Sequence, residues 1–335
     1  MLARLEDTVP EGEEWRFEPK WDGFRALVFR DGDEIAVQSR DTRPLERYFP
    51  EVVSAVASLP PGSWVVDGEV LIMGSDGLDF GALLQRIHPA ASRIQMLAEK
   101  TPATLVVFDI LAAGSKDLRG SDDDARREEL ERWAASIGVG AAPEELDHLA
   151  PGPEILLTPR TKDRDTAMRW YADEVGIGQD GLIARRGDLL YREGERAMVK
   201  IKHRRTVDCV VGGYRLAKDG EGVASLLLGL YGGDVLHYVG HTSSFRAPQR
   251  RELLERLAPL EGEGGFGRGR SPGGLSRWTA GRSTEWTPLR PELVCEVSID
   301  RMQGERFRHA ATFQRWRDDR DPATCTFDQL SSGRR

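Results

Sequence analysis

The stretch that decides the fold runs from residue 15 to residue 29 and reads WRFEPKWDGFRALVF. Its last part, 24–29, is a strand-like apolar run, and the Asp-Gly-Asp at 31–33 predicts a hairpin to a second strand at 35–39. Lys20 stands just before this hairpin, at the head of a Lys-Trp-Asp-Gly sequence. A lysine held beside Asp-Gly at the mouth of a sheet is a candidate covalent nucleophile. Taken alone, the same residues also fit an exposed lysine before a turn.

The chain up to residue 203 mixes strand and helix patterns. Further strands are expected at 64–73, 104–111, 181–186 and 196–202, helices at 121–136 and 165–175, and a loop at 138–153. Ser121 is a candidate cap for the first of these helices. The pattern predicts an α+β fold in which antiparallel sheets are favoured over a doubly wound sheet.

The character of the sequence changes after residue 203. Short β-like runs broken by Gly or Asp are expected at 207–214, 224–231, 235–241 and 293–299, with one helix at 248–257 and a Gly-, Arg- and Ser-rich surface loop at 262–281. Short strands with one helix suit a small barrel such as an OB-fold. The expected domains are residues 1–203 and residues 204–335.

Length and composition indicate a globular protein of about two domains. The chain has 335 residues, of which 39% are apolar and 30% charged, and it has no run long enough to span a membrane. Its first residues lack the apolar segment of a signal peptide. Cys209, Cys295 and Cys325 are far apart in the sequence, so neither a disulfide framework nor a zinc site is supported. A reducing cytoplasm is the expected location.

The charge is unevenly divided along the chain. The net charge is −8, yet residues 200–335 carry 23 Lys and Arg against 17 Asp and Glu, a net of +6, which leaves −14 on residues 1–199. This asymmetry suits a polyanionic partner such as nucleic acid, although a solvated basic face explains the charge alone equally well. The candidate phosphate-contacting residues of the basic part are Arg204, Arg205, Arg246, Arg250, Arg251, Arg268, Arg270, Arg277 and Arg282.

Seven polar clusters follow one another along the chain. They are KWDGFR at 20–25, SRD at 39–41, DGE at 67–69, VFDIL at 107–111, DGLIAR at 180–185, VKIK at 199–202 and RWRDDR at 315–320. Each cluster is weak evidence alone, but their joint order and spacing make a strong signal. In this order, the chain from Trp15 to its C-terminus resembles the ATP-dependent DNA ligases of the covalent nucleotidyltransferase superfamily, and most of all the compact bacterial ligase C class.

The resemblance implies a fold and a reaction. The implied fold is a nucleotidyltransferase domain, an ATP-grasp-like adenylation domain of antiparallel sheets, over residues 1–203, followed by an OB-fold barrel over residues 204–335. In the implied reaction Lys20 attacks the α-phosphate of ATP, forms a lysyl-AMP phosphoramidate and releases pyrophosphate.

A lysine is protonated at neutral pH and cannot attack, so nearby positive charge that disfavours the ammonium form is needed. Lys200, Lys202 and a bound Mg²⁺, with Mn²⁺ as a substitute, are expected to supply it while neutralising the phosphates. Two lysines at i and i+2 on a strand share a face and can point at one phosphate chain. A solvated strand edge is the alternative explanation for this pair.

The resemblance also assigns residues to the nucleotide. Glu18 is expected at the adenine, because a carboxylate accepts from the exocyclic amine of adenine but not from O6 of guanine. Phe108 is expected to stack on the base, although its strand pattern also fits a core residue. Glu69 and Arg25 are expected at the ribose. Arg40 is expected near the ribose or at the 5′-phosphate of a nick, unless it forms a surface ion pair.

Two clusters depart from the usual pattern of the family. Asp180 stands where most relatives carry glutamate, and we expect it, with Glu69, to bind the metal through oxygen. Asp109 could join this acidic set or be a buried structural residue. The final cluster has Arg317, Asp319 and Arg320 where many relatives have R-x-D-K, and arginine keeps the charge and grips phosphate bidentately. The resemblance assigns these three residues to the β- and γ-phosphates, closing over them through a domain rotation.

The resemblance implies nicked double-stranded DNA as substrate and a role in DNA repair. It further implies a monomer in the bacterial cytoplasm, associated with the nucleoid and not with a membrane. Other DNA-repair proteins, such as a repair polymerase or an end-binding factor, are candidate partners.

Two other functions fit the same residues. A capping-type guanylyltransferase or an RNA ligase uses the same lysine chemistry on a different acceptor, but Glu18 favours adenine over guanine. A non-catalytic nucleic-acid-binding protein is a further alternative, and the retention of Lys20, Glu69, Lys200 and Lys202 argues against it.

Overall fold

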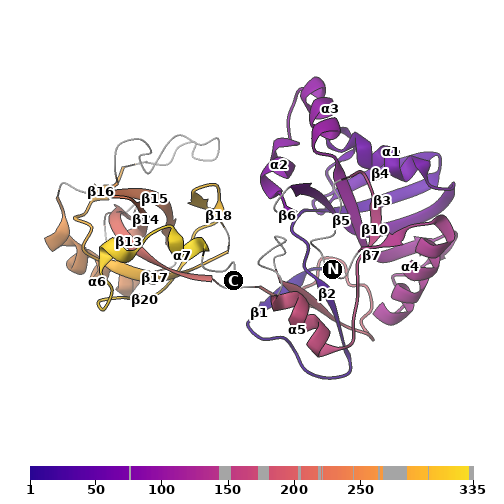
Figure 1. The fold of residues 1–335 in the computed structure, drawn as a ribbon. Coiled ribbons are helices and arrows are strands. Elements are labelled where there is room, and N and C mark those ends of the chain that lie inside the picture. Colours follow the sequence, from indigo (N-terminus) through magenta and orange to yellow (C-terminus); the bar gives the residue numbers. More distant parts are fainter. Residues whose placement is uncertain are drawn as a thin grey trace. The chain divides into compact units, whose positions relative to one another are not determined.

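The chain forms two compact units, Met1–His203 and Arg204–Arg335 (Figure 1). This computed structural model describes residues 1–74, 77–142, 152–172, 181–202, 205–217, 220, 222–243, 245–262, 265–266, 285–300 and 302–331. Each unit combines helices with largely antiparallel sheets, as predicted for an α+β protein. Within these ranges, no helix is long and apolar enough to cross a membrane.

The larger sheet of the first unit has the strand order β4-β3-β5-β7-β10-β9. Its strands are β3 Phe24–Gly32, β4 Glu34–Ser39, β5 Gly62–Gly74, β7 Ala103–Ala113, β9 Gly140–Ala141 and β10 Ile155–Leu157, with β6 Gly77–Leu78 and β8 Lys116–Asp117 paired to β5 and β7. The hairpin of β3 and β4 is confirmed, and β3, β5 and β7 are antiparallel as predicted. Strand β10 instead pairs in parallel with β7 and β9.

The two faces of this sheet have different roles. On one face Val28, Val66 and Ile110 pack against helices to form the core. Those helices are α1 Pro50–Ser58, α2 Phe80–Gln85 and α4 Asp123–Ile137, with the short helix η1 Glu46–Tyr48, whereas α3 Ala91–Lys100 lies against α1 and η1. On the other face, Arg25 and Glu69 lie directly opposite each other on β3 and β5. Directly opposed residues of antiparallel strands point to the same side, so these two polar side chains share the face away from the helices.

Helix α4 begins later than the sequence suggests. The Oδ1 of Asp122 accepts a hydrogen bond of 2.8 Å from the backbone N–H of Ala125, so Asp122 is the cap and the prediction of Ser121 was wrong. Both residue types cap helices, and only the geometry of the first turn selects between neighbours. Of the loop expected at 138–153, residues 143–151 lie outside the described residues, and the described part departs from the prediction in containing the short strand β9.

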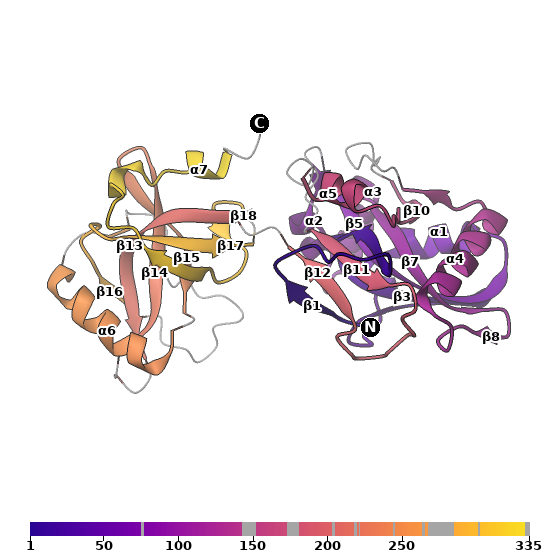
Figure 2. The same cartoon turned by 90° about the horizontal axis from the view of Figure 1, so that it is seen from below.

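The smaller sheet of the first unit brings the two ends of that unit together. Its order is β1-β12-β11-β2, with β1 Ala3–Glu6, β2 Trp15–Pro19, β11 Leu182–Arg186 and β12 Met198–Ile201. Helix α5, Arg164–Ala172, lies on one face of this sheet (Figures 1 and 2). Its Trp170 packs with Phe17, Leu182 and Val199 in one buried cluster. In the strand register, Ile183 of β11 lies opposite Glu18 of β2 on one side and opposite Lys200 of β12 on the other. These three residues therefore share the face of the sheet away from α5.

The second unit is built on an antiparallel sheet of order β15-β14-β13-β17-β20. Its strands are β13 Arg205–Leu216, β14 Val223–Gly232, β15 Val235–Thr242, β17 Val294–Ile299 and β20 Thr312–Trp316, with the short β16 Thr287–Pro288, β18 Met302–Gln303 and β19 Arg306–Phe307. The predicted helix is confirmed as α6, Ala247–Leu257, and the short helices are η4 Ala258–Leu260, η5 Pro322–Thr324 and α7 Asp328–Ser331.

A closed barrel, which we expected for the second unit, is not formed by its described strands. Strands β15 and β20 stand at the two ends of the sheet order, and a single parallel bridge joins Thr242 to Ala311. Cys209, Cys295 and Cys325 are buried and form no disulfide.

Candidate active site

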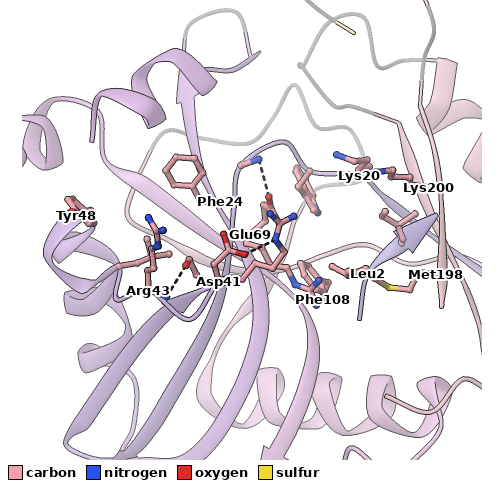
Figure 3. A pocket seen from close by; sticks show the side chains of 18 of the residues that line it. Leu2, Lys20, Phe24, Asp41, Arg43, Tyr48, Glu69, Phe108, Met198 and Lys200 are labelled. Carbon is pink, nitrogen blue, oxygen red and sulfur yellow. Dashed lines mark hydrogen bonds and ion pairs between the residues drawn. The ribbon is translucent and has the colours of Figure 1, made fainter. Parts of the chain in front are cut away.

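A cavity of about 920 Å³ lies in the first unit, and both of its sheets contribute to the wall (Figure 3). In Figure 3, Lys20 and Lys200 stand at one end of the cavity, Arg43 and Tyr48 at the other, and Glu69 lies between them. The sequence-predicted residues in the wall are Lys20, Arg25, Arg40, Glu69, Phe108 and Lys200. Residues more than a hundred positions apart in sequence therefore meet in one cavity.

The loop that carries Lys20 is held on both sides. The backbone N–H of Lys20 donates to the carbonyl of Gly181 at 2.8 Å, and the indole N–H of Trp21 donates to Thr158 Oγ1 at 2.9 Å. Gly23 allows the chain to pass close to β5, because a Cβ there would lie 2.2 Å from the carbonyl oxygen of Val70. This packing explains why glycine follows the aspartate in the Lys-Trp-Asp-Gly sequence.

Glu69 faces the cavity from β5 and accepts a hydrogen bond of 3.2 Å at Oε1 from the backbone N–H of Gly23. Removal from bulk water raises the pKa of Glu69 to about 7, while the positive charges of Lys20 and Arg25 oppose this rise. The carboxylate therefore interacts electrostatically with Lys20 and sits close to its protonation midpoint at neutral pH.

Phe108 reaches the cavity because β7 contains a bulge. Asp67 of β5 pairs with Asp109 of β7, and Gly68, the next residue of β5, pairs with Val107. Phe108 lies between these two partners and pairs with no residue of β5. A bulge re-aims the extra side chain. The ring is half-buried in the cavity wall, with the Arg25 and Arg185 guanidinium carbons 5.8 Å and 5.5 Å from its centre. The alternative that Phe108 is plain core does not hold.

Glu18 lies behind the cavity wall, buried, and is not one of the lining residues. Its Oε2 accepts a hydrogen bond of 2.5 Å from Arg185, and its Oε1 lies 4.0 Å from Arg127 Nη1. Asp109 is also buried, between Arg126 and Arg185 at 2.8 Å and 3.1 Å. Burial alone would raise the pKa of Asp109, but these two arginines lower it below its usual value. The structure therefore supports a buried structural role for Asp109.

The remaining expected residues have separate locations. Arg40 lines the cavity and forms the expected exposed ion pair with Asp41, with 3.5 Å between Nε and Oδ1, while its contact with the ribose or the nick stays a prediction. Lys202 follows the end of β12 and does not line the cavity. Asp180 lies outside the described residues. Across the residues that are described, no group of three or more His, Cys, Asp and Glu is arranged to hold a metal ion.

The charged cluster of the second unit forms its own network. Arg317 pairs with Asp319 through Nε and Oδ1 at 2.9 Å, and through Nη2 and Oδ2 at 2.9 Å. This hydrogen bonding raises the pKa of Arg317 and lowers that of Asp319 to about 2. Arg317 and Arg320 also face Asp208 of β13, a residue that we did not predict.

Several other cavity residues had no predicted role. They include Leu2, Ala3, Arg43, Arg47, Tyr48, Ile183, Arg196 and Met198. Ile183 was open to prediction, because alternation along β11 sets it apart from Leu182 and Ala184, which are buried against α5. Leu2 had no usable signal, since it depends on the parallel pairing of β1 with β12.

Sequence similarity to known proteins extends over nearly the whole chain. Residues 1–202 match the family model of the ATP dependent DNA ligase domain, and residues 219–320 match that of the ATP dependent DNA ligase C terminal region. DNA ligase C2 of Mycolicibacterium smegmatis is 45% identical, with 99% of this chain and 94% of that protein aligned.

Two further likenesses are more distant. The multifunctional non-homologous end joining DNA repair protein LigD of Mycobacterium tuberculosis is 29% identical over 93% of this chain and 37% of its own length. A solved Lig E DNA ligase chain has a TM-score of 0.53 at 15% identity, with 94% of this chain and 98% of that chain aligned, which is a likeness of fold. The two family models and the 45% identity to DNA ligase C2 establish that the chain belongs to the ATP-dependent DNA ligase family.

Proposed function

We propose that this chain uses ATP to seal nicks in duplex DNA through a lysyl-AMP intermediate on Lys20. The observation that carries the proposal is one cavity in which Lys20, Glu69, Phe108 and Lys200 meet, within the residues that match the ligase domain. A lysine nucleophile, a carboxylate, a stacking ring and a second cation are the groups that nucleotidyl transfer to an amine needs.

The reaction has three transfers. The neutral amine of Lys20 attacks the α-phosphorus of ATP, the bond to the β-phosphate breaks, and pyrophosphate leaves. The AMP then passes to the 5′-phosphate at the nick, and the lysine amine is released. Finally the 3′-hydroxyl attacks the activated 5′-phosphate, forms the phosphodiester and releases AMP. Lys200 neutralises the phosphates from the cavity wall, with Lys202 just beyond the end of β12 as a further cation, so positioning and charge do most of the work.

The nucleotide contacts follow from the cavity wall. Phe108 stacks on the adenine, and Arg25 and Glu69 bind the ribose. Glu18 does not line the cavity, and its proposed contact with the adenine amine rests on the family resemblance, with Arg185 holding its Oε2 in place. Arg40, exposed at the cavity rim, binds the ribose or the 5′-phosphate of the nick.

The family implies Mg²⁺, with Mn²⁺ as a substitute, and the described residues fit it in part. Mg²⁺ in phosphate-transfer sites is held by one or two carboxylates together with substrate phosphates. Glu69 supplies one carboxylate in the cavity wall, and its pKa of about 7 allows a cation to ionise it. Asp180 is the proposed second ligand. A bound Mg²⁺ would neutralise phosphate charge beside Lys20.

The second unit is proposed to be an OB-like domain that serves two steps. Arg317, Asp319 and Arg320 act on the β- and γ-phosphates during the first transfer, and the basic surface of this unit then holds the duplex. A repair role is supported by the likeness to LigD, whose name assigns that protein to non-homologous end joining. A repair polymerase or an end-binding factor is the kind of partner that this role needs, and a monomer is sufficient for the chemistry.

The test combines labelling with sealing on the same protein. We expect α-labelled ATP with Mg²⁺ to label the protein, α-labelled GTP not to, and mass spectrometry to find the AMP adduct on Lys20. The labelled protein should seal nicked DNA in preference to nicked RNA, and Lys20→Ala should do neither. Labelling by GTP would favour a guanylyltransferase, whereas sealing by Lys20→Ala would refute the lysine mechanism.

A further inference from the structure

One buried carboxylate of the second unit faces both arginines of the final charged cluster. The Nη1 atom of Arg317 lies 3.0 Å and 3.1 Å from the two carboxylate oxygens of Asp208, and the Nε atom of Arg320 lies 3.6 Å from Oδ2. Asp208 stands on β13, 109 positions before Arg317 in the sequence. This pairing is therefore a product of the tertiary fold.

Asp208 is itself held firmly. Its backbone N–H donates to Gln329 Oε1 at 3.1 Å, and the side-chain amide of Gln329 donates to the Asp208 carbonyl at 3.1 Å. Strand β14 pairs with β13 only from Val210 onward, so Gln329 completes the hydrogen bonding of the strand at Asp208. The carboxylate consequently projects from a rigid backbone.

The two arginines stay accessible while Asp208 orients them. The Arg317 side chain is 18% exposed and that of Arg320 is 37% exposed, against 11% for the Asp208 side chain. Asp319 holds the Nε and Nη2 side of Arg317, and Asp208 holds the Nη1 side. Arginine has many rotamers, and a fixed carboxylate removes most of them before the phosphates arrive.

We propose that Asp208 is a positioning residue for Arg317 and Arg320 in the transfer of AMP from ATP to Lys20. This inference rests on the proposed function, in which the two arginines bind the β- and γ-phosphates. Those phosphates leave as pyrophosphate at the end of the first transfer. The contribution of Asp208 is therefore confined to that step, and phosphodiester formation at a nick that already carries AMP does not need it.

The same sheet offers a matched control. Glu296 of β17 lies directly opposite Asp208 in the register. Its Oε2 pairs with Nε of Arg315 at 2.6 Å, and no described contact joins it to Arg317 or Arg320 by hydrogen bond or salt bridge. Replacing Glu296 removes a carboxylate that acts on Arg317 only through its charge, and more weakly than Asp208 does.

The experiment measures two steps separately in the full-length protein. The first assay follows lysyl-AMP formation from ATP, and the second follows sealing of a nicked duplex whose 5′-phosphate already carries AMP. We expect Asp208→Ala to slow the first by about tenfold or more and to leave the second within about twofold. Asp208→Asn, which keeps an acceptor, should recover part of the rate, and Glu296→Gln should change neither assay by more than about twofold.

Three results would overturn the inference. Equal losses in both assays would mean that Asp208 only maintains the fold of the second unit. An unchanged first step would mean that the arginines need no such support. If the losses in the rate of lysyl-AMP formation from Asp208→Ala and Arg317→Ala simply add in the double variant, the two residues act independently. A wild-type protein that forms no lysyl-AMP would instead refute the proposed function itself, and the inference with it.

Discussion

The guanidinium of Arg185 donates a hydrogen bond of 2.5 Å to the Oε2 of Glu18, and both side chains are buried. The same guanidinium reaches Asp109 and the carbonyl of Phe108 on β7, and Asp123 on α4. Glu18 and Arg185 belong to the smaller sheet, whereas β7 belongs to the larger one. Arg185 thus joins the two sheets whose residues line the cavity.

The role of Arg185 predicts a large loss of stability on its removal. Arg185→Met leaves three buried carboxylates short of a partner, and breaking a buried ion pair costs about 3–5 kcal/mol. The free energy of unfolding, measured by urea titration, should fall by that amount. Arg186→Ala is the control, because its ion pair with Asp188 is exposed and should contribute nothing measurable. Equal stability of the two variants would contradict the role given to Arg185.

The close packing of Gly23 predicts a functional loss from one added methyl group. In Gly23→Ala the Cβ would overlap the carbonyl oxygen of Val70, so the loop must move and weaken the hydrogen bond to Glu69. We expect the rate of lysyl-AMP formation to fall by about a hundredfold, as a displacement near 1 Å does in active sites. Gly120→Ala is the control, because no heavy atom lies within 4 Å of its added Cβ. Similar rates for Gly23→Ala and Gly120→Ala would contradict the view that close packing of Gly23 on β5 positions the loop.

The bulge at Phe108 predicts a defect in nucleotide affinity. Loss of base stacking costs about 1–3 kcal/mol, so Phe108→Ala should raise the KM for ATP by about tenfold or more. Phe108→Trp keeps an aromatic face and should stay near the wild-type value. Steady-state lysyl-AMP formation at varied ATP concentration measures both. A KM for Phe108→Ala that matches wild type would mean that the base lies elsewhere.

Glu69 predicts a dependence of stability on pH. Its pKa is raised from 4.5 to about 7 in the folded chain. Between these values the folded state binds more protons than the unfolded state, so the stabilisation is full below about 4.5 and is lost as pH rises through about 7. The quantity to follow is the difference in unfolding free energy between wild type and Glu69→Gln. This difference should fall by up to about 3 kcal/mol as the pH rises from 4.5 to 7. A difference that is constant from pH 4.5 to 7 would rule this out.

The basic second half of the chain predicts salt-sensitive DNA binding. Residues 200–335 carry a net charge of +6, and contacts to phosphate release counterions from DNA. The affinity for a nicked duplex should therefore fall steeply between low and moderate salt in an equilibrium binding assay. The affinity for ATP, measured in parallel, should change much less. A DNA affinity that stays flat over this range would exclude a binding mode dominated by phosphates.

The local sequence predicted the elements that carry a strong pattern. The hairpin of β3 and β4, helix α4 and the main strands of the second unit follow from apolar alternation and turn residues. The helices α1, α2 and α3 were missed because each has ten residues or fewer, which is too short for a periodic pattern to distinguish a helix from other structure. The clusters around Lys20, Glu69 and Lys200 were found because their residue types and order are distinctive.

The sequence by itself determined which groups are available: an amine at position 20, carboxylates at 18 and 69, and a ring at 108. Only the tertiary structure decided which of them meet. The register of β2, β11 and β12 aligns Glu18, Ile183 and Lys200, and the bulge in β7 turns Phe108 to the cavity. Glu18 became a buried partner of Arg185, and Asp208 a partner of Arg317, because strand pairing joins segments that are far apart in the chain. Such contacts depend on closure of the whole fold, and no local pattern encodes them.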